Sequence, residues 1–160
     1  MDEASLKEAD LNEGIKSTLV ILNNSLSNVS VVVDLRPIPQ ILCYPGKLNQ
    51  VFMNIMSNAA AAIAEKFGNQ KGGMLTVRTY QEESGKVCVS IADNGIGMDE
   101  HTLSKVYEPF FTTKKVGAGV GLGMSIVFSI IKEHHAQIEV KSKLGEGTEF
   151  IIKLDSLKDI

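Results

Sequence analysis

One long amphipathic segment, KLNQVFMNIMSNAAAAIAEKF at residues 47–67, constrains the fold of this chain more than any other feature. Apolar residues recur there at intervals of three and four over roughly five turns, the pattern of an α-helix with a wide apolar stripe. Pro45 and Gly46 precede the segment, and glycines between residues 68 and 73 end it. The stripe consists of Leu48, Val51, Phe52, Ile55, Met56 and Ile63.

Two further helices are predicted, one on each side of this segment. Asp10 and Glu13 have the spacing of a capping box, and apolar residues then recur at helical intervals, so a helix is expected from about residue 11 to 27. The other helix is expected from near Gly121 to about His134, directly after a glycine-rich stretch.

Six segments have the composition or the alternation of β-strands: 29–35, 39–44, 74–81, 86–93, 137–142 and 148–154. The first two are separated by Pro37 and Pro39, and we expect them to form a hairpin or to be neighbouring strands. Three long helices and about five to six strands predict an α+β fold, a two-layer sandwich in which helices cover one face of a single sheet.

Length and charge limit the possible functions. The chain has 160 residues, enough for one domain, which we expect over residues 10–160 after a tail or stub at residues 1–9. A net charge of −3 without a basic block gives no footprint for nucleic acid or for an anionic membrane surface. No signal peptide or metal-ligand spacing of Cys and His is present, so a cytoplasmic location is expected.

Two asparagines interrupt the apolar neighbourhood of the long helix. Asn54 and Asn58 are four residues apart and therefore project from the same helix face. An amide oxygen is a neutral, hard ligand that suits Mg²⁺ retaining waters and phosphate oxygens. The alternative is that both side chains mark the edge of the buried stripe and contact only water or backbone.

Asp93 ends a predicted buried strand and begins the sequence DNGIGM. A carboxylate there accepts hydrogen bonds only, which suits an exocyclic amino group such as that of adenine. Gly95 and Gly97 would let a flat base approach the backbone, although Asp-Asn-Gly is also ordinary turn chemistry. Thr148 starts a strand, where its hydroxyl could donate to a carboxylate on a neighbouring strand or where it could simply be a strand former.

The stretch GAGVGLGMSIV places four glycines directly before the third predicted helix. Free backbone amides at a helix N-terminus form an anion site, and a triphosphate fits it. The glycine spacing matches neither a P-loop nor a dinucleotide-binding turn. Upstream, YEPFFTTKK offers Lys114 and Lys115 as point charges for phosphate oxygens, and the two segments together could form a lid. A flexible loop with solvated lysines is the alternative.

In this order, five segments resemble the N, G1, F, G2 and G3 boxes of the catalytic ATP-binding domain of bacterial sensor histidine kinases. They are NQVFMNIMSNA, DNGIGM, EPFFTTKK, GAGVGLGMSIV and GEGTEF. That domain belongs to the superfamily of gyrase, the Hsp90 chaperones, histidine kinases and MutL. The resemblance covers about residues 10 to 155, and five motifs in order are highly specific.

The resemblance implies a Bergerat sandwich, with a mixed sheet under three helices and Mg-ATP between the helices and a lid. Asp93 and Thr148 would bind the adenine, and Asn58 would ligate Mg²⁺ with Asn54 beside the phosphates. Catalytic roles would fall to Asn54 and Lys114. The full nucleotide-binding set that it implies is Asn54, Asn58, Asp93, Gly95, Gly97, Met98, Lys114, Lys115, Gly119, Gly121, Leu122, Gly123 and Thr148.

Position 54 separates two chemistries within that superfamily. Hydrolysing members carry a glutamate there as a general base, whereas an asparagine, as in the kinases, cannot accept the proton. The resemblance therefore implies phosphoryl transfer to a histidine and little hydrolysis. Ala61 and Ala62 stand where many kinases have a lysine or arginine, and His134-His135-Ala136 replaces the usual His-Gly-Gly.

No histidine of this chain lies in a phosphoacceptor helix pattern, so the accepting histidine is expected on dimerisation and phosphoacceptor helices upstream of residue 1. A response regulator is expected as the partner of the complete kinase, which could be membrane-anchored. Two other functions stay open at this point. One is a non-catalytic ATP-binding regulatory module, and the other is an ATPase or serine kinase of the same superfamily.

Overall fold

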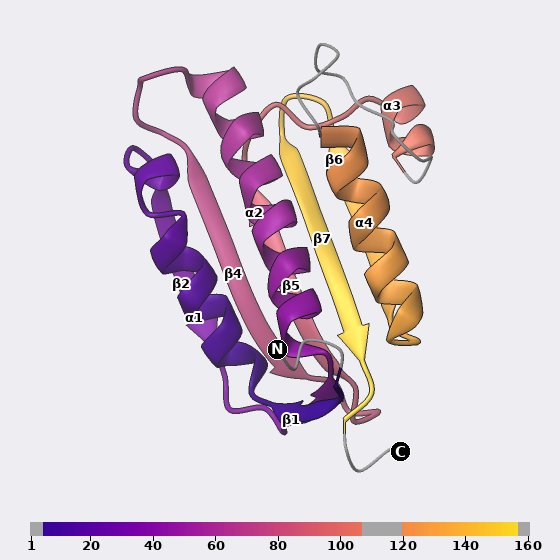
Figure 1. The fold of residues 1–160 in the computed structure, drawn as a ribbon. Helices are drawn as coiled ribbons and strands as arrows, with labels where there is room; N and C mark the ends of the chain where they lie inside the picture. Colours follow the sequence, from indigo (N-terminus) through magenta and orange to yellow (C-terminus); the bar gives the residue numbers. More distant parts are fainter. Residues whose placement is uncertain (1–4, 107–119, 157–160) are drawn as a thin grey trace.

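A computed structural model of the chain describes residues 5–106 and 120–156, with only the backbone described at residues 120–122. Three helices lie side by side over one face of a five-stranded sheet (Figure 1). They are α1 (Leu11–Ile21), α2 (Pro45–Phe67) and α4 (Val120–Glu133). The predicted class, an α+β two-layer sandwich with helices on one face, is confirmed.

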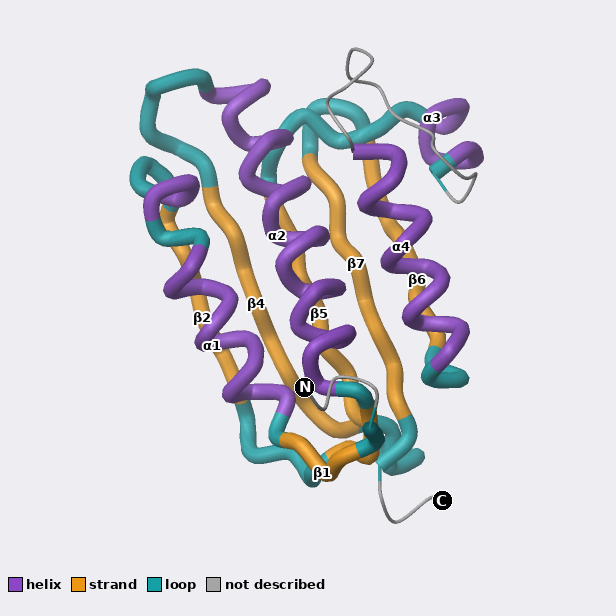
Figure 2. The backbone as a smooth tube through the Cα atoms, viewed as in Figure 1, coloured by secondary structure: helices purple, strands orange, loops and turns teal. Residues whose placement is uncertain are grey.

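The main sheet has the order β2-β4-β5-β7-β6. Its strands are β2 (Ser30–Leu35), β4 (Met74–Gln81), β5 (Val87–Asp93), β6 (Gln137–Lys143) and β7 (Gly147–Leu154). The β2–β4 pair is parallel and the other pairs are antiparallel, so the sheet is mixed. Figure 2 shows the strands running behind the helical layer.

The core lies between the helices and the sheet. Helix α2 crosses the middle of the sheet, and its apolar stripe is almost completely buried against β4, β5 and β7. The sheet supplies the apolar surface against which α2 packs. Alternate residues of β4 and β5 face the helices, so Leu75, Val77 and Ile91 lie on the same buried face. Within the described part of the chain, no helix is both long enough and apolar enough to cross a bilayer.

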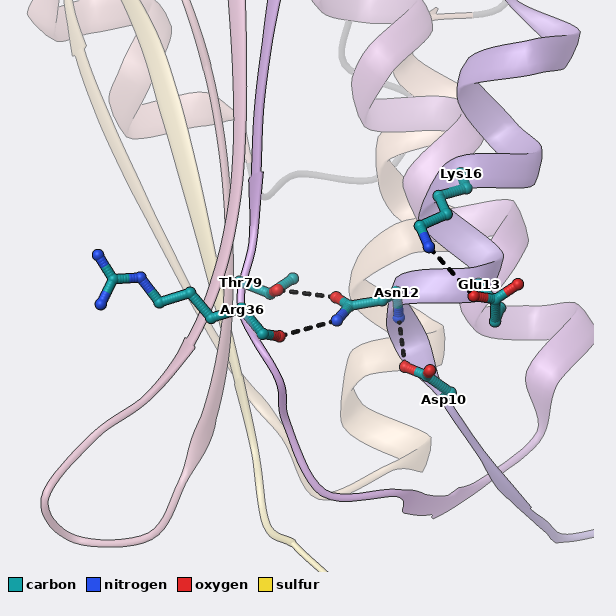
Figure 3. Close-up of polar contacts among 6 residues, drawn as sticks. All are labelled: Asp10, Asn12, Glu13, Lys16, Arg36 and Thr79. Carbon is teal, nitrogen blue, oxygen red and sulfur yellow. Dashed lines mark hydrogen bonds and ion pairs between the residues drawn. The ribbon is translucent and has the colours of Figure 1, made fainter.

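Helix α1 is held at its first turn by polar contacts (Figure 3). The Asp10 carboxylate accepts from the Asn12 amide at 2.9 Å, so the predicted N-cap is confirmed. Glu13 contacts Lys16 at 3.3 Å. Asn12 then joins the helix to the sheet, because its side chain donates to the Arg36 carbonyl at 2.8 Å and accepts from the buried Thr79 hydroxyl at 2.7 Å.

Two expectations about the first strands were wrong. Residues 30–35 and 41–43 are not neighbours: β2 pairs with β4, whereas β3 (Ile41–Cys43) pairs with β1 (Lys7–Ala9) in a separate two-stranded sheet. Pro37 and Pro39 hold the connection extended and remove two donors, so it cannot turn back as a hairpin. Residues 7–9 therefore belong to the folded unit and not to the tail expected over residues 1–9.

The first predicted helix is also shorter than expected. Helix α1 ends at Ile21, and a separate 3-10 turn, η2 (Asn24–Leu26), follows it. The third helix agrees closely with its prediction, since α4 begins at Val120 and ends at Glu133.

Candidate functional site

A cavity of about 260 Å³ opens at the C-terminal half of α2, between that helix, the loop after β5 and the β6–β7 turn. A short helix, α3 (Glu100–Lys105), forms part of its wall. The lining residues are Asn58, Ala59, Ala61, Ala62, Glu65, Asp93, Ile96, Gly97, Met98, Asp99, Thr102, Val106, Met124, Leu144, Thr148 and Phe150. Five of the sequence-predicted site residues line this cavity together: Asn58, Asp93, Gly97, Met98 and Thr148.

Asp93 lies at the end of β5 and is one of three acidic residues that line the cavity, with Glu65 and Asp99. Burial in these surroundings raises the pKa of its carboxyl group from 3.8 to about 6. The backbone amides of Gly95 and Thr148 both donate to the carboxylate and oppose part of that rise, with the Gly95 bond at 2.8 Å. The carboxylate is therefore partly desolvated, fixed in orientation and open to a ligand that donates a hydrogen bond.

The loop after Asp93 is pressed against α2. A side chain at Gly95 would have its Cβ 2.5 Å from the Ala62 carbonyl carbon, and the Ile96 amide donates to the Ala62 carbonyl at 3.1 Å. Gly97 has a φ of +69°, and a Cβ at this position would collide with the Lys143 carbonyl oxygen. The two glycines thus allow the loop to contact both layers of the sandwich, which fixes one wall of the cavity.

Thr148 lies opposite Asp93 in the β5–β7 register. Its side chain is buried, and its hydroxyl lies 2.7 Å from the Ser142 hydroxyl on β6. Ser142 also accepts from the Met98 amide at 2.8 Å and donates to the Gly147 carbonyl at 3.0 Å. The suggested donation from the Thr148 hydroxyl to a neighbouring carboxylate is not among the contacts of this network, in which the backbone amide of Thr148 contacts Asp93.

Asn54 and Asn58 project from one face of α2, as predicted, but toward different neighbours. Asn58 lines the cavity. The Asn54 amide donates to the Gly123 carbonyl in the first turn of α4 at 3.2 Å. A Cβ at Gly123 would lie 3.7 Å from the Asn54 amide nitrogen, an ordinary contact distance. Asn54 therefore joins the cavity-bearing helix to the helix that follows the glycine-rich stretch.

The remaining predicted residues are only partly described. Lys114, Lys115 and Gly119 lie outside the described residues, as does the whole YEPFFTTKK segment. The backbone of Gly121 and Leu122 is in the first turn of α4, where amides have no partner within the helix. This backbone position is the one that an anion-binding helix N-terminus requires.

Thr102 and Ser142 are among the residues in and around the site that were not predicted from the sequence. Helix α3 supplies Thr102 to the cavity, and its signal was Asp99, whose carboxylate caps the helix by accepting from the Thr102 amide at 2.7 Å. Ser142 was missed because it was taken only as the end of a strand. The alternation of Ile138, Val140 and Ser142 places the serine on the buried side of β6, which could have identified it.

Among the described residues, no group of three or more His, Cys, Asp or Glu side chains converges as a metal cage. Protein carboxylates therefore do not build a closed cation site in this part of the chain. A single amide oxygen at Asn58 fits Mg²⁺ of the kind that keeps most of its waters and binds phosphate oxygens.

Comparison with known families gives a match over most of the chain. The model of the family described as "Histidine kinase-, DNA gyrase B-, and HSP90-like ATPase" matches residues 43–158. Sporulation kinase E of Bacillus subtilis is 38% identical over 151 residues, covering 92% of this chain and 19% of that protein. The sensor histidine kinase ZraS of Escherichia coli K12 is 30% identical, over 94% of this chain and 31% of its own length.

Solved structures give the same fold. The mycobacterial sensor histidine kinase MprB has a TM-score of 0.79 at 26% identity, covering 93% of this chain and 96% of that chain. The nucleotide-free catalytic domain of histidine kinase ThkA has a TM-score of 0.78 at 26% identity, covering 95% and 96% of the two chains. These matches confirm the resemblance inferred from the five sequence motifs. The chain spans 19% of the length of Sporulation kinase E and 32% of the length of Sporulation kinase B.

Proposed function

Because the chain belongs to the histidine kinase-, DNA gyrase B- and HSP90-like ATPase family, we propose that it binds Mg-ATP and transfers the γ-phosphoryl group to a histidine. The accepting histidine would lie on separate dimerisation and phosphoacceptor helices, within a two-component signalling protein. The named relatives, which are sensor and sporulation kinases much longer than this chain, support the proposal.

The observation that carries the proposal is the desolvated Asp93 carboxylate inside the cavity. It is held by two backbone amides and accepts only, so it favours a base that presents an exocyclic amino group at this point. Adenine has its amino group at C6, whereas guanine held in the same orientation presents a C6 carbonyl oxygen that would repel the carboxylate. A volume of about 260 Å³ is near the lower end of the range for ligand pockets. This volume suits the base of a nucleotide whose phosphates extend outside the cavity.

The phosphates would extend from this cavity along α2 toward the first turn of α4. Asn58, Asn54 and the free amides at the start of α4 succeed one another in that direction. Asn58 would hold Mg²⁺, which supplies charge neutralisation for the triphosphate when it is bound. Lys114, Lys115 and Gly119 would contribute from the segment between residues 107 and 119.

Asn54 argues for transfer over hydrolysis. Its amide donates to the Gly123 carbonyl and has no basic atom with which to deprotonate a water molecule. We therefore expect the bound nucleotide to be stable until the accepting histidine reaches it. A response regulator would receive the phosphoryl group from that histidine in the complete protein.

The test of nucleotide recognition is a titration of this chain with ATP and with GTP in the presence of Mg²⁺. Wild-type protein should prefer ATP. Asp93→Ala should abolish ATP binding, while its circular dichroism spectrum stays that of the wild-type protein and its unfolding transition stays cooperative. Equal affinity of the wild-type protein for the two nucleotides, or undiminished ATP binding by Asp93→Ala, would refute the assignment of base recognition to Asp93.

The test of the reaction uses ATP labelled in the γ-phosphate and the phosphoacceptor helices of the same protein. Acid-labile, base-stable label on the helices is the expected result, because phosphohistidine has that stability. ATP binding without a labelled histidine would favour the alternative function, a non-catalytic ATP-binding regulatory module. Steady phosphate release without an acceptor would indicate an ATPase, and Asn54→Glu should raise that release if the missing base explains its absence.

The metal role of Asn58 has its own test. Asn58→Ala should weaken ATP binding when Mg²⁺ is present and have little effect when a chelator removes it. The same loss in both conditions would contradict the assignment of Asn58 as a metal ligand.

A further inference from the structure

The turn between β6 and β7 forms one edge of the cavity, and the function proposed above assigns no role to the contacts that hold it there. Leu144 is the residue of this turn that lines the cavity, and its side chain is 60% exposed. A large apolar side chain that is open to water at the edge of a cavity gains when a ligand covers it. A base in the cavity would therefore bind better if the turn holds Leu144 in place.

Three hydrogen bonds join this turn to two other segments that line the cavity, and together they form a closed ring. The Ile96 amide, in the loop after β5, donates to the Ala62 carbonyl of α2 at 3.1 Å, and the Gly145 amide donates to the Ile96 carbonyl at 2.6 Å. Lys66 completes the ring, because its ammonium group donates to the Gly145 carbonyl at 2.6 Å. Ala62 and Lys66 are four residues apart and therefore lie on the same face of α2.

Lys66 contributes the one side chain of this ring, since its other donors and acceptors are backbone groups. The ammonium group also lies 5.3 Å from the centre of the Phe67 ring, a cation–π contact that favours its position beside the turn. Lys66 is not among the residues that line the cavity, whereas Leu144 is. Lys66 can therefore act on a bound nucleotide either through the turn that carries Leu144 or through the attraction of its charge for the phosphates.

We propose that Lys66 is a positioning residue of the nucleotide site, which holds the β6–β7 turn against α2 and so keeps Leu144 at the edge of the base cavity. The proposal rests on the function proposed above, since it concerns the affinity of that site for its base. It predicts two effects of losing the Lys66 side chain. The turn opens more often in the free protein, and every ligand that carries the base binds more weakly, whatever its charge.

Amide hydrogen exchange of the free protein tests the first effect. Exchange of the Gly145 amide requires its bond to the Ile96 carbonyl to open, so Lys66→Met should raise its exchange rate about three-fold, as expected for the loss of one exposed, charged donor. The Val89 amide, in the centre of β5 and of the sheet, should exchange as in the wild-type protein. An unchanged rate at Gly145, or an equal rise at Val89, would overturn the proposal.

Titrations with ATP and with adenosine test the second effect and separate positioning from charge, because adenosine carries the base without phosphates. Lys66→Met should weaken the binding of both ligands by the same factor, about three-fold. Lys66→Arg keeps a charged donor on a long side chain and should retain most of the affinity for both. A loss confined to ATP would show an attraction of the lysine charge for the phosphates and would overturn the proposal, as would an unchanged affinity for both ligands.

Lys143→Met is the matched control. Lys143 is the last residue of β6 and directly precedes Leu144. Its side chain is 78% exposed, and its ammonium group forms an ion pair with Glu146 at 3.3 Å. The substitution removes one lysine charge from the same turn and leaves the ring of hydrogen bonds intact, so the Gly145 exchange rate and the adenosine affinity should not change. Equal effects of the two lysine substitutions would overturn the proposal.

A double substitution tests whether Lys66 acts through Leu144. In a Leu144→Ala background, Lys66→Met should cause little further loss of adenosine affinity, because the side chain that Lys66 positions is already absent. A full additional loss would overturn the proposal. Wild-type protein that binds neither ATP nor adenosine would refute the proposed function, whereas wild-type affinity that Lys66→Met retains refutes only this inference. The exchange rate at Gly145 needs no ligand and shows in either case whether Lys66 holds the turn.

Discussion

The two ends of helix α2 use polar groups in opposite ways. At its N-terminal end, the Tyr44 amide donates to His134 Nε2 at 3.1 Å, and His134 Nδ1 donates to the Ile130 carbonyl at 2.8 Å. Lys47 forms an ion pair with Glu133 at 2.8 Å, so the start of α2 is tied to the end of α4. Each of these hydrogen-bonding groups has a partner within the protein.

At the other end, the cavity keeps a charged group under-satisfied. Asp93 is partly desolvated, and the backbone amides that contact it do not fully compensate, because the pKa of its carboxyl group stays raised. The comparison indicates that the N-terminal junction stabilises the contact between α2 and α4, whereas the cavity end gives up stability because it holds a partly desolvated carboxylate.

The largest expected effect is at the turn that carries Thr148. A Cβ at Gly147, whose φ is +118°, would collide with the Asp93 carbonyl oxygen, so Gly147→Ala should lower the free energy of unfolding by about 3 kcal/mol or more. Gly145→Ala is the control, because Gly145 also has a positive φ of +82° but no atom within 4 Å of its Cβ position. It should cost about 1 kcal/mol. Equal losses in chemical denaturation would show that the cavity end is not tightly packed.

Asp93→Asn tests the cost of the buried carboxylate. The pKa of Asp93 in the folded state, about 6, lies above the unfolded value of 3.8. Between pH 4 and about 6 the folded protein therefore binds more protons than the unfolded chain. The free energy of unfolding of the wild-type protein consequently falls as the pH rises through this window. At pH 7 the variant should therefore be more stable, by at most about 3 kcal/mol, and the gain should vanish near pH 4.

Urea unfolding of both proteins from pH 4 to pH 8 measures this difference. Asp34→Asn, at an exposed position of β2, should change the stability by less than about 0.5 kcal/mol at any pH in that range. A gain for Asp93→Asn that does not depend on pH would contradict the electrostatic explanation of the comparison.

His134→Phe tests the junction end. The phenyl ring keeps much of the edge contact with Tyr44 but leaves the Tyr44 amide without its acceptor, so the variant should lose about 1 to 2 kcal/mol. Lys47→Met removes the ion pair with Glu133, and because both side chains are 39% exposed it should cost about 0.5 kcal/mol or less. If the lysine variant lost more than the histidine variant in thermal unfolding, the junction would depend on charge and not on the imidazole.

A small gain in stability is expected at the turn after α4. His135 has a φ of +54°, a conformation that favours glycine, and it stands at the position of the second residue of the usual His-Gly-Gly. His135→Gly should raise the free energy of unfolding by up to about 1 kcal/mol without changing ATP affinity. A lower unfolding midpoint would show that the His135 side chain stabilises the turn.

Much of the fold could be predicted because its strongest patterns are local. The stripe of α2, the alternation in β5 and the cap at Asp10 each depend on residues a few positions apart. The pairing of β2 with β4 and of β3 with β1 could not be predicted in the same way. Partners in these pairs are far apart along the chain, and short apolar strands fit several neighbours.

The residues of the candidate site also differ in whether local sequence patterns could predict them. Asp93, Asn58 and Thr148 were found because their motifs are contiguous, and the structure brings all three to one cavity. Ser142 and Thr102 were missed because their local signals, the alternation in β6 and the Asp99 cap of α3, indicate a buried strand position and a helix start and not a site. Their positions depend on how β6 and α3 pack against the loop after β5.

The sequence by itself determined the residue chemistry of this protein: a carboxylate without a basic neighbour at the end of a buried strand, and two amides on one helix face. Only the tertiary structure decided how desolvated that carboxylate is, which backbone amides contact it, and which two helix ends are joined. Desolvation and hydrogen-bond direction depend on all atoms around a group, and those atoms come from segments that the sequence keeps far apart.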